Sequence, residues 1–188
     1  QKVPVTICFN KIDLVYQEKL KEYSGIYEPA GYNVIFTCTK TKEGLGSIRS
    51  LLEGKTTTVA GPSGVGKSSI INCLQSDITM ETGTISEKIE RGKHTTRHSE
   101  IIPVSHDTYI MDTPGFSSMD VPGFEKENLW TCYPEFVPYE PECRFIGCSH
   151  IGEPDCGVKN ALAEGKINQV RYDNYVMLYE EMKNIHKY

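Results

Sequence analysis

The sequence has no long hydrophobic run: nowhere do about 18 apolar residues follow one another, so we expect no membrane-spanning segment. No secretory signal peptide is visible, and we expect a cytoplasmic protein that does not bind membranes. The sequence also has no excess of basic residues: acidic residues outnumber them, and the net charge is −5. Binding to nucleic acid through charge alone is therefore not expected, although a local basic patch or a further segment could contact RNA. The chain starts without Met, so we expect it to be part of a longer protein.

The cysteines are the unusual part of the composition. There are seven in 188 residues, and three of them fall within residues 143–156. In a cytosolic chain, clustered cysteines favour metal binding over disulfides. The length suits one α/β domain with its own core and a small appendage.

Residues 61–68 (GPSGVGKS) match the pattern of a phosphate-binding loop, and a predicted strand (56–60) and helix (69–74) flank them. The backbone N–H groups of such a loop bind phosphate oxygens, and its glycines let the backbone curl. Lys67 would neutralise the β- and γ-phosphates as a catalytic residue, and Ser68 would bind Mg²⁺. A chance glycine-rich turn is the alternative. The predicted nucleotide-binding residues of this loop are Gly61, Pro62, Ser63, Gly64, Val65, Gly66, Lys67, Ser68 and Ser69.

Asn10, Lys11, Ile12 and Asp13 follow a predicted buried strand, and the tetrad resembles the guanine-specificity motif of GTPases. An Asp can accept hydrogen bonds from guanine's ring N–H and exocyclic amine, and an Asn amide can reach N7 and O6. A turn that caps the next helix is the alternative. After a second predicted strand (32–36), a polar loop resembles the second base-contacting loop of GTPases. It contributes Cys38, Thr39 and Lys40.

Two later segments resemble the switch loops of GTPases. In residues 92–98, Thr96 is the favoured sensor of Mg²⁺ and the γ-phosphate, with Thr95 close behind, and His94 is the candidate for positioning the attacking water. An ordinary exposed loop with an exposed His is the alternative. A predicted hairpin (100–111) then leads into the second segment.

That second segment is Asp112-Thr-Pro-Gly115, which resembles the Asp-x-x-Gly motif of GTPases. Asp112 would hold Mg²⁺, directly or through a water, and the Gly115 N–H would touch the γ-phosphate. Regulatory GTPases carry a water-positioning Gln next, whereas this chain has Phe116. Hydrolysis would therefore use another group or a partner, or it would be slow.

Near the C-terminus, the spacing Cys-x4-Cys-x-His-x5-Cys predicts a structural Zn²⁺ site with four protein ligands and no open position. Three free cysteines with an unrelated His are the alternative, and Cys132 is expected to be a spare thiol. From Val158 onward the pattern is helical, with a predicted apolar stripe. The predicted metal ligands are Cys143, Cys148, His150 and Cys156. The predicted stripe comprises Tyr175, Leu178, Met182 and Ile185.

Together these motifs resemble the bacterial ribosome small-subunit-dependent GTPase A family over nearly the whole chain. The resemblance implies a monomeric GTP hydrolase that uses GTP, Mg²⁺ and one structural Zn²⁺. It also implies stimulation by the small (30S) ribosomal subunit during late subunit maturation, contact with rRNA, and an N-terminal OB-fold absent here. The alternatives are a GTP-binding ribosome adaptor with negligible hydrolysis, or a small-molecule kinase with the same phosphate loop.

The motif order, with base loops first and phosphate loop later, predicts an α/β fold: a circularly permuted P-loop GTPase domain at 1–119, with a mostly parallel sheet and helices on both faces. A small, mainly helical zinc-binding domain would follow at 120–188. One strand between the phosphate-loop strand and the Asn-Lys-x-Asp strand is expected to precede residue 1, because the sheet would otherwise leave backbone groups unpaired.

Overall fold

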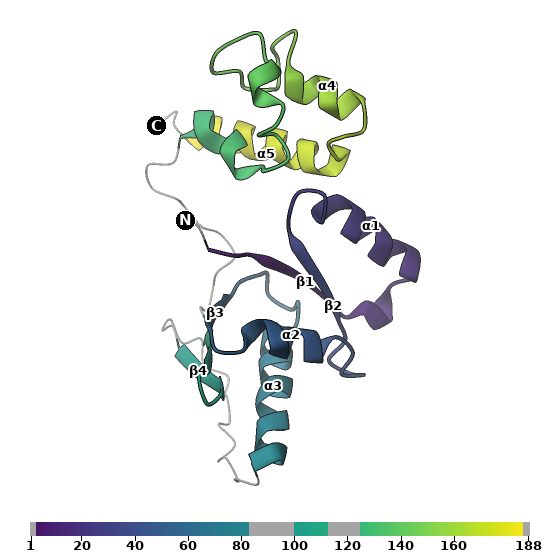
Figure 1. Cartoon of the computed structure of the whole chain (residues 1–188), viewed down its shortest axis with the longest axis vertical. Helices are drawn as coiled ribbons and strands as arrows, with labels where there is room; N and C mark the ends of the chain where they lie inside the picture. The colour runs from purple at the N-terminus through teal and green to yellow at the C-terminus, as the bar shows by residue number, and fades with distance from the viewer. Residues whose placement is uncertain (1–2, 83–99, 113–124, 186–188) are drawn as a thin grey trace. The chain divides into compact units, whose positions relative to one another are not determined.

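The computed structural model describes residues 3–82, 100–112 and 125–185 (Figure 1). Contacts within the chain divide it into two compact units. One comprises Thr6–Leu20 and Val34–Asp120, and we call it the sheet unit. The other comprises Gln1–Val5, Lys21–Asn33 and Val121–Tyr188, and we call it the cysteine unit. The predicted domains, 1–119 and 120–188, differ from this grouping by the two N-terminal stretches, and they stay a prediction.

The described strands form two sheets. The first has two strands, β1 (Thr6–Asn10) and β2 (Asn33–Thr37). The second has the order β3-β5-β4, with β3 at Thr56–Val59, β5 at Thr108–Asp112 and β4 at Glu100–Ser105. β3 and β5 are parallel, whereas β4 and β5 are antiparallel and form the predicted hairpin.

The division into two sheets is relevant to the additional strand that is expected between β1 and β3. Direct pairing of those two strands would contradict that expectation, and among the described strands they belong to separate sheets. The additional strand stays a prediction. The predicted mostly parallel arrangement holds for β3 and β5, while the hairpin adds an antiparallel strand at the edge.

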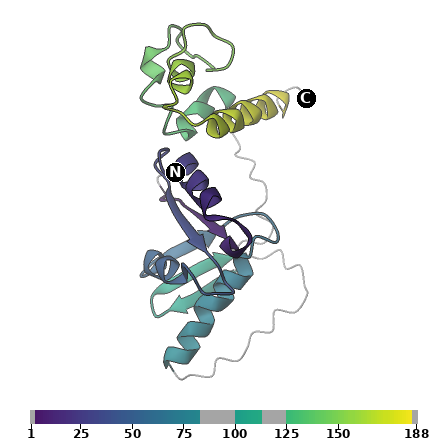
Figure 2. The same ribbon diagram turned by 90° about the vertical axis from the view of Figure 1, so that its right-hand side faces the viewer.

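Two helices build the core of the sheet unit. α2 (Leu45–Leu52) buries apolar residues at helical spacing, and α3 (Lys67–Thr82) buries Ile71 and Leu74. Figure 2 shows α3 running alongside the three-stranded sheet. α3 begins directly after the phosphate loop, and its buried apolar residues hold the helix in place with its N-terminus at that loop. The buried core residues of this unit are Leu45, Ile48, Leu52, Ile71, Leu74, Ile102, Val104 and Ile110.

The cysteine unit is built from short helices and irregular segments. Its elements include two 3₁₀ helices, η2 (Lys126–Cys132) and η3 (Glu140–Glu142), and two α-helices, α4 (Gly157–Ala163) and α5 (Gln169–Ile185). α1 (Gln17–Tyr27) begins in the sheet unit and ends in the cysteine unit. The core of the cysteine unit is aromatic, with Phe136 and Tyr175 buried and their ring centroids 5.0 Å apart. Among the described residues, no helix combines the length and the apolar character that crossing a membrane would need.

The apolar stripe predicted for α5 is partly wrong. Tyr175 and Met182 pack on the core as predicted, but Leu178 is 38% exposed. The side chain of Ile185 lies outside the described residues. The buried face instead collects tyrosines, whose hydroxyl groups reach polar partners while the rings stay apolar. The α5 residues on this face are Tyr172, Tyr175, Val176, Tyr179 and Met182.

Candidate functional site

Residues 10–13, which we call the base tetrad, and the phosphate loop at residues 61–68 contact each other within the sheet unit. The Asn10 Nδ2 donates to the Val65 carbonyl oxygen at 3.0 Å, and the Lys11 ammonium donates to the Gly64 carbonyl oxygen at 2.6 Å. Lys11 follows the end of β1 in the left-handed region, with φ 67°. The chain turns sharply there, and the two hydrogen bonds bring together segments that lie more than 50 positions apart in the sequence.

Gly66 is the residue that permits this close approach. Its φ is +99°, which disfavours any side chain, and a Cβ at this position would overlap with the Asn10 Nδ2 atom. The glycine of the phosphate-loop pattern thus serves two purposes here. It lets the loop curl, and it leaves room for the Asn of the base tetrad.

The Asp13 carboxylate is held by the second predicted base loop. Its Oδ2 accepts a hydrogen bond from the Lys40 ammonium at 2.6 Å, and its Oδ1 accepts one from the Cys38 thiol at 3.4 Å. The hydrogen bond from Lys40, followed by smaller contributions, lowers the pKa of the Asp13 carboxyl group. The same bond raises the pKa of Lys40. The carboxylate is therefore ionised at neutral pH, as an acceptor for two N–H groups must be.

Thr37 is a further contributor, whose role its residue type did not predict. It ends β2, is fully buried, and its hydroxyl donates to the Asn10 Oδ1 at 3.2 Å. This bond fixes which way the Asn10 amide points, so that Nδ2 faces the phosphate loop. The signal in the sequence was a Thr directly before the polar loop, at the end of a strand that could be predicted. In the polar loop that follows, the Thr39 carbonyl oxygen accepts a hydrogen bond from the Cys73 thiol at 3.9 Å.

The phosphate loop surrounds a pocket of about 330 Å³, within the range of roughly 300–1,000 Å³ typical of small-ligand sites. α3 begins at Lys67, so the free N–H groups of its first turn lie at this pocket. The Lys67 ammonium donates to the carbonyl oxygens of Gly61 at 2.6 Å and Pro62 at 2.9 Å. The lining residues are Lys11, Ser63, Gly64, Gly66, Lys67, Ser68 and Ser69.

The predicted switch residues lie outside the described residues. These are His94, Thr95, Thr96, Gly115 and Phe116. Asp112 closes β5, and its backbone pairs in register with Val59, two residues before the phosphate loop starts. The strand register therefore brings Asp112 to the same end of the sheet as that loop.

The four predicted metal ligands form one cluster in the cysteine unit. Their ligand atoms all lie within 4.8 Å of one another, and Cys148, His150 and Cys156 are buried. The His150 Nδ1 lies 3.5 Å from the sulfurs of Cys143 and Cys156, which are 3.8 Å apart. A tetrahedral ion with bonds of about 2.3 Å to sulfur and about 2.0 Å to nitrogen would separate two sulfurs by about 3.8 Å and a sulfur from the nitrogen by about 3.5 Å. The cluster fits such an ion.

The protonation chemistry of the cluster also suits a cation. Burial raises the pKa of the Cys148 thiol to about 12, so this thiol stays protonated unless a cation displaces the proton. Burial lowers the pKa of His150, which keeps the imidazole neutral and able to ligate. Cys132 is exposed and stands outside the cluster, as expected for a spare thiol. Of the three remaining cysteines, Cys38 is buried, Cys73 is half-buried and Cys8 is exposed.

Hydrogen bonds hold the cluster's backbone from outside. The Tyr172 hydroxyl donates to the His150 carbonyl oxygen at 2.6 Å, and the Tyr175 hydroxyl donates to the Ser149 carbonyl oxygen at 2.7 Å. The Glu153 carboxylate accepts from the backbone N–H and the hydroxyl of Ser149, each at 2.9 Å. Partial burial alone would raise the pKa of Glu153, but these bonds outweigh it and lower the pKa to about 2. The ligand-bearing turn is thus fixed by α5 and by one carboxylate.

Comparison with known proteins gives consistent matches. The model of the RsgA GTPase family matches residues 1–122. The small ribosomal subunit biogenesis GTPase RsgA of Agathobacter rectalis is 77% identical over 188 residues, which are 100% of this chain and 62% of that protein. The protein of the same name from Alkaliphilus metalliredigens is 45% identical, over 100% of this chain and 64% of that protein.

Two solved structures share the fold. YjeQ from Thermotoga maritima is 32% identical with a TM-score of 0.78, over 96% of this chain and 60% of that one. YloQ, described as a circularly permuted GTPase, is 33% identical with a TM-score of 0.75, over 97% of this chain and 58% of that one. The permuted GTPase fold predicted from the motif order is therefore confirmed. The chain spans about three fifths of the length of these relatives.

Proposed function

Because this chain belongs to the RsgA GTPase family, we propose that it binds GTP and hydrolyses it to GDP and phosphate during late maturation of the small ribosomal subunit. The observation that carries the proposal is the contact between the base tetrad and the phosphate loop, made by Asn10 and Lys11 on the carbonyl oxygens of Val65 and Gly64. A site that recognises guanine at one end and phosphates at the other needs these two segments side by side.

The base end of the site would select guanine through Asp13. Its oxygens each accept one hydrogen bond from Cys38 or Lys40, which leaves each a second lone pair. Guanine's ring N–H and exocyclic amine can take those positions, whereas adenine lacks this donor pair. Asn10 uses Oδ1 and one N–H internally, so its second N–H is left for the base. Ile12, Thr39 and the stem of Lys11 would complete the base pocket.

The phosphate end would work through charge and aligned N–H groups. The loop and the first turn of α3 offer backbone donors, and the Lys67 ammonium is within reach of the same pocket. An ammonium has three donors, and two of Lys67's are on loop carbonyls, so the third can bind a phosphate oxygen. Lys67 would thereby stabilise the charge that develops on the transferred phosphoryl group.

Mg²⁺, when bound, neutralises charge on the β- and γ-phosphates. Ser68 lines the pocket and is the proposed ligand there, with Asp112 and Thr96 completing the set. Thr95 and the Gly115 N–H would contact the γ-phosphate. His94 is the proposed water-positioning group, because Phe116 cannot orient water by hydrogen bonding.

The Cys143, Cys148, His150 and Cys156 cluster is proposed to hold one Zn²⁺ ion. Four protein ligands leave no open position, so its role would be structural. We propose two domains, a GTPase domain at 1–119 and a zinc-binding domain at 120–188.

We propose that the protein is a cytoplasmic monomer. It would contact the small subunit and its rRNA, and it would make no membrane contact.

Two rival functions make different predictions. An adaptor that binds GTP without useful hydrolysis is favoured by Phe116, and it predicts turnover that subunits do not raise. A small-molecule kinase with the same phosphate loop predicts no preference for guanine, which the Asn10–Asp13 tetrad argues against.

The deciding experiment is GTP turnover by the full-length protein with and without purified small subunits. We expect stimulation by small subunits and none by large subunits. Equal turnover in all three reactions would reject the proposed function in favour of the adaptor.

A further inference from the structure

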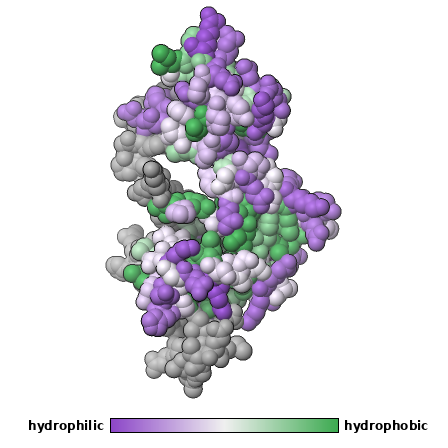
Figure 3. Space-filling model, viewed as in Figure 1, coloured by the Kyte–Doolittle hydropathy of each residue, from purple (hydrophilic) through white to green (hydrophobic). Residues whose placement is uncertain are grey.

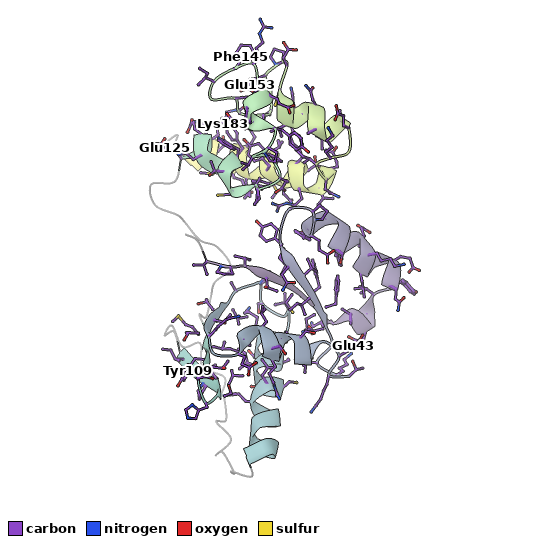
Figure 4. All side chains as sticks on the ribbon, viewed as in Figure 1. Glu43, Tyr109, Glu125, Phe145, Glu153 and Lys183 are labelled. Atoms are coloured by element: carbon purple, nitrogen blue, oxygen red, sulfur yellow. The ribbon has the colours of Figure 1, made fainter. Side chains whose placement is uncertain are left out.

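The loop between the first two cysteine ligands exposes two large apolar side chains. In residues 144–147, Phe145 is 43% exposed and Ile146 is completely exposed, at 106% of the reference area. Figure 4 shows Phe145 at one end of the cysteine unit, and Figure 3 shows a small hydrophobic group at that end, bordered by hydrophilic side chains. Single exposed apolar residues are common, whereas these two adjacent side chains form a small apolar patch whose burial by a partner would be favourable.

The loop that carries this pair is held in place. The Arg144 backbone N–H donates to the Asp155 carbonyl oxygen at 3.1 Å, and the Arg144 guanidinium donates to the Asp155 carboxylate at 3.0 Å. The same guanidinium lies 5.6 Å from the centroid of the Phe145 ring. Cys143 and Cys148, which flank the loop, belong to the metal cluster. A loop fixed in this way loses little conformational freedom when it binds, so its apolar pair is preorganised for contact.

The surrounding charge indicates the chemistry of the partner. Residues 125–185 carry eleven Asp and Glu side chains against six Lys and Arg side chains. Beside the loop, the charge of Arg144 is neutralised by Asp155, and Glu142 is exposed just before Cys143. A phosphate backbone would be repelled by such a surface. A basic protein surface would be attracted to it.

We propose that the loop 144–147 docks onto a basic protein of the small ribosomal subunit, with Phe145 and Ile146 entering an apolar pocket and Glu142 facing its basic rim. This inference rests on the proposed function, because the small subunit is the proposed partner. The apolar pair supplies the central contact that excludes water, and the acidic surroundings select a protein over RNA.

Removing the apolar pair tests the docking surface. The variant Phe145→Ser/Ile146→Ser of the full-length protein should bind small subunits at least tenfold more weakly with a non-hydrolysable GTP analogue. Its affinity for GDP and its metal content should stay unchanged. The matched control is Met177→Ser on α5, which removes an apolar side chain that is 53% exposed and should bind normally. Normal binding by the double variant would overturn the docking surface alone. Wild-type protein that does not bind small subunits would overturn the proposed function as well.

Reversing one charge distinguishes the partner class. Glu142→Lys should weaken binding if the partner is a basic protein, and it should strengthen binding if the partner is rRNA. A photo-reactive amino acid at position 146 should crosslink to a small-subunit protein. Tighter binding by Glu142→Lys together with crosslinks to rRNA would overturn the proposal in favour of RNA.

Discussion

The Lys11 ammonium donates to the Gly64 carbonyl oxygen at 2.6 Å, across 53 positions of sequence. This bond ties the tetrad at the end of β1 to the loop that follows β3. The two strands belong to different sheets among the described residues, so side-chain bonds of this kind connect the two halves of the proposed nucleotide site.

Removal of the Lys11 ammonium should therefore affect the phosphate loop as well as the base. We expect Lys11→Met to weaken GDP binding about fivefold to tenfold, because an exposed charged hydrogen bond contributes roughly 1 kcal/mol. Calorimetric titration with GDP measures this. Lys21→Met, which removes the same charge from an exposed position on α1, is the control and should bind GDP normally. Equal affinities for all three proteins would show that the Lys11 bond is incidental.

Gly66→Ala should destabilise the nucleotide-free protein by about 1–3 kcal/mol, because it combines strain at positive φ with overlap on Asn10. Gly64→Ala is the matched control: its φ is +81°, yet nothing lies within 4 Å of the added Cβ. It should suffer the strain alone. Denaturant unfolding measures both, and adding Asn10→Ala to Gly66→Ala should recover part of the loss. A Gly64→Ala variant as unstable as Gly66→Ala would contradict the overlap.

The pH dependence of Asp13 should follow from its bond to Lys40. Because Lys40 lowers the pKa of Asp13, the pair contributes stability above the carboxyl group's unfolded pKa of about 3.9, and this contribution is lost as the pH falls through the folded pKa. Lys40→Met should raise the pKa of Asp13. The carboxyl-carbon chemical shift of Asp13, followed against pH by NMR, measures the change. Lys55→Met is the control, since Lys55 bonds to the Leu51 carbonyl oxygen instead. An unshifted Asp13 titration in Lys40→Met would refute the pairing.

Metal removal should be visible in the fluorescence of the chain's single Trp. The Trp130 ring lies edge-on to the His150 ring, with centroids 6.0 Å apart. We expect one Zn²⁺ per chain by elemental analysis, and a shifted Trp130 emission with a lower unfolding temperature after chelation. Cys156→Ser should reproduce the chelated state, whereas Cys132→Ser should behave as wild type. A metal-free protein with unchanged emission and stability would contradict a structural metal.

The sequence was most informative where chemistry demands a fixed pattern. The Cys143–Cys156 spacing predicted four ligands that the structure brings within 4.8 Å of one another, because metal ligands must converge. The loop Gly61–Ser68 and its flanking strand and helix were predictable because phosphate binding requires a glycine-rich loop between a strand and a helix N-terminus. The hairpin of β4 and β5 followed from two strand-like segments on either side of the polar turn at residues 105–107.

What could not be predicted depends on tertiary neighbours. Thr37 looks like any strand residue until its hydroxyl is seen to orient the Asn10 amide. The stripe on α5 was misread at Leu178 because tyrosines, which carry a polar hydroxyl, form the buried face beside the cluster. The exposure of Phe145 and Ile146 could not be predicted either, because an apolar residue type favours burial and the sequence does not show which neighbours cover it.

The most direct test of a single guanine-nucleotide site is the base preference of Asp13→Asn, measured by calorimetric titration with GDP and xanthosine diphosphate. Xanthine carries a carbonyl group where guanine carries its exocyclic amine, so an amide donor at position 13 suits xanthine better. We predict that the wild-type protein binds GDP far more tightly, and that Asp13→Asn prefers the xanthine nucleotide. A variant that keeps the wild-type preference for GDP would contradict the proposal that Asp13 reads the base of a nucleotide held by the phosphate loop.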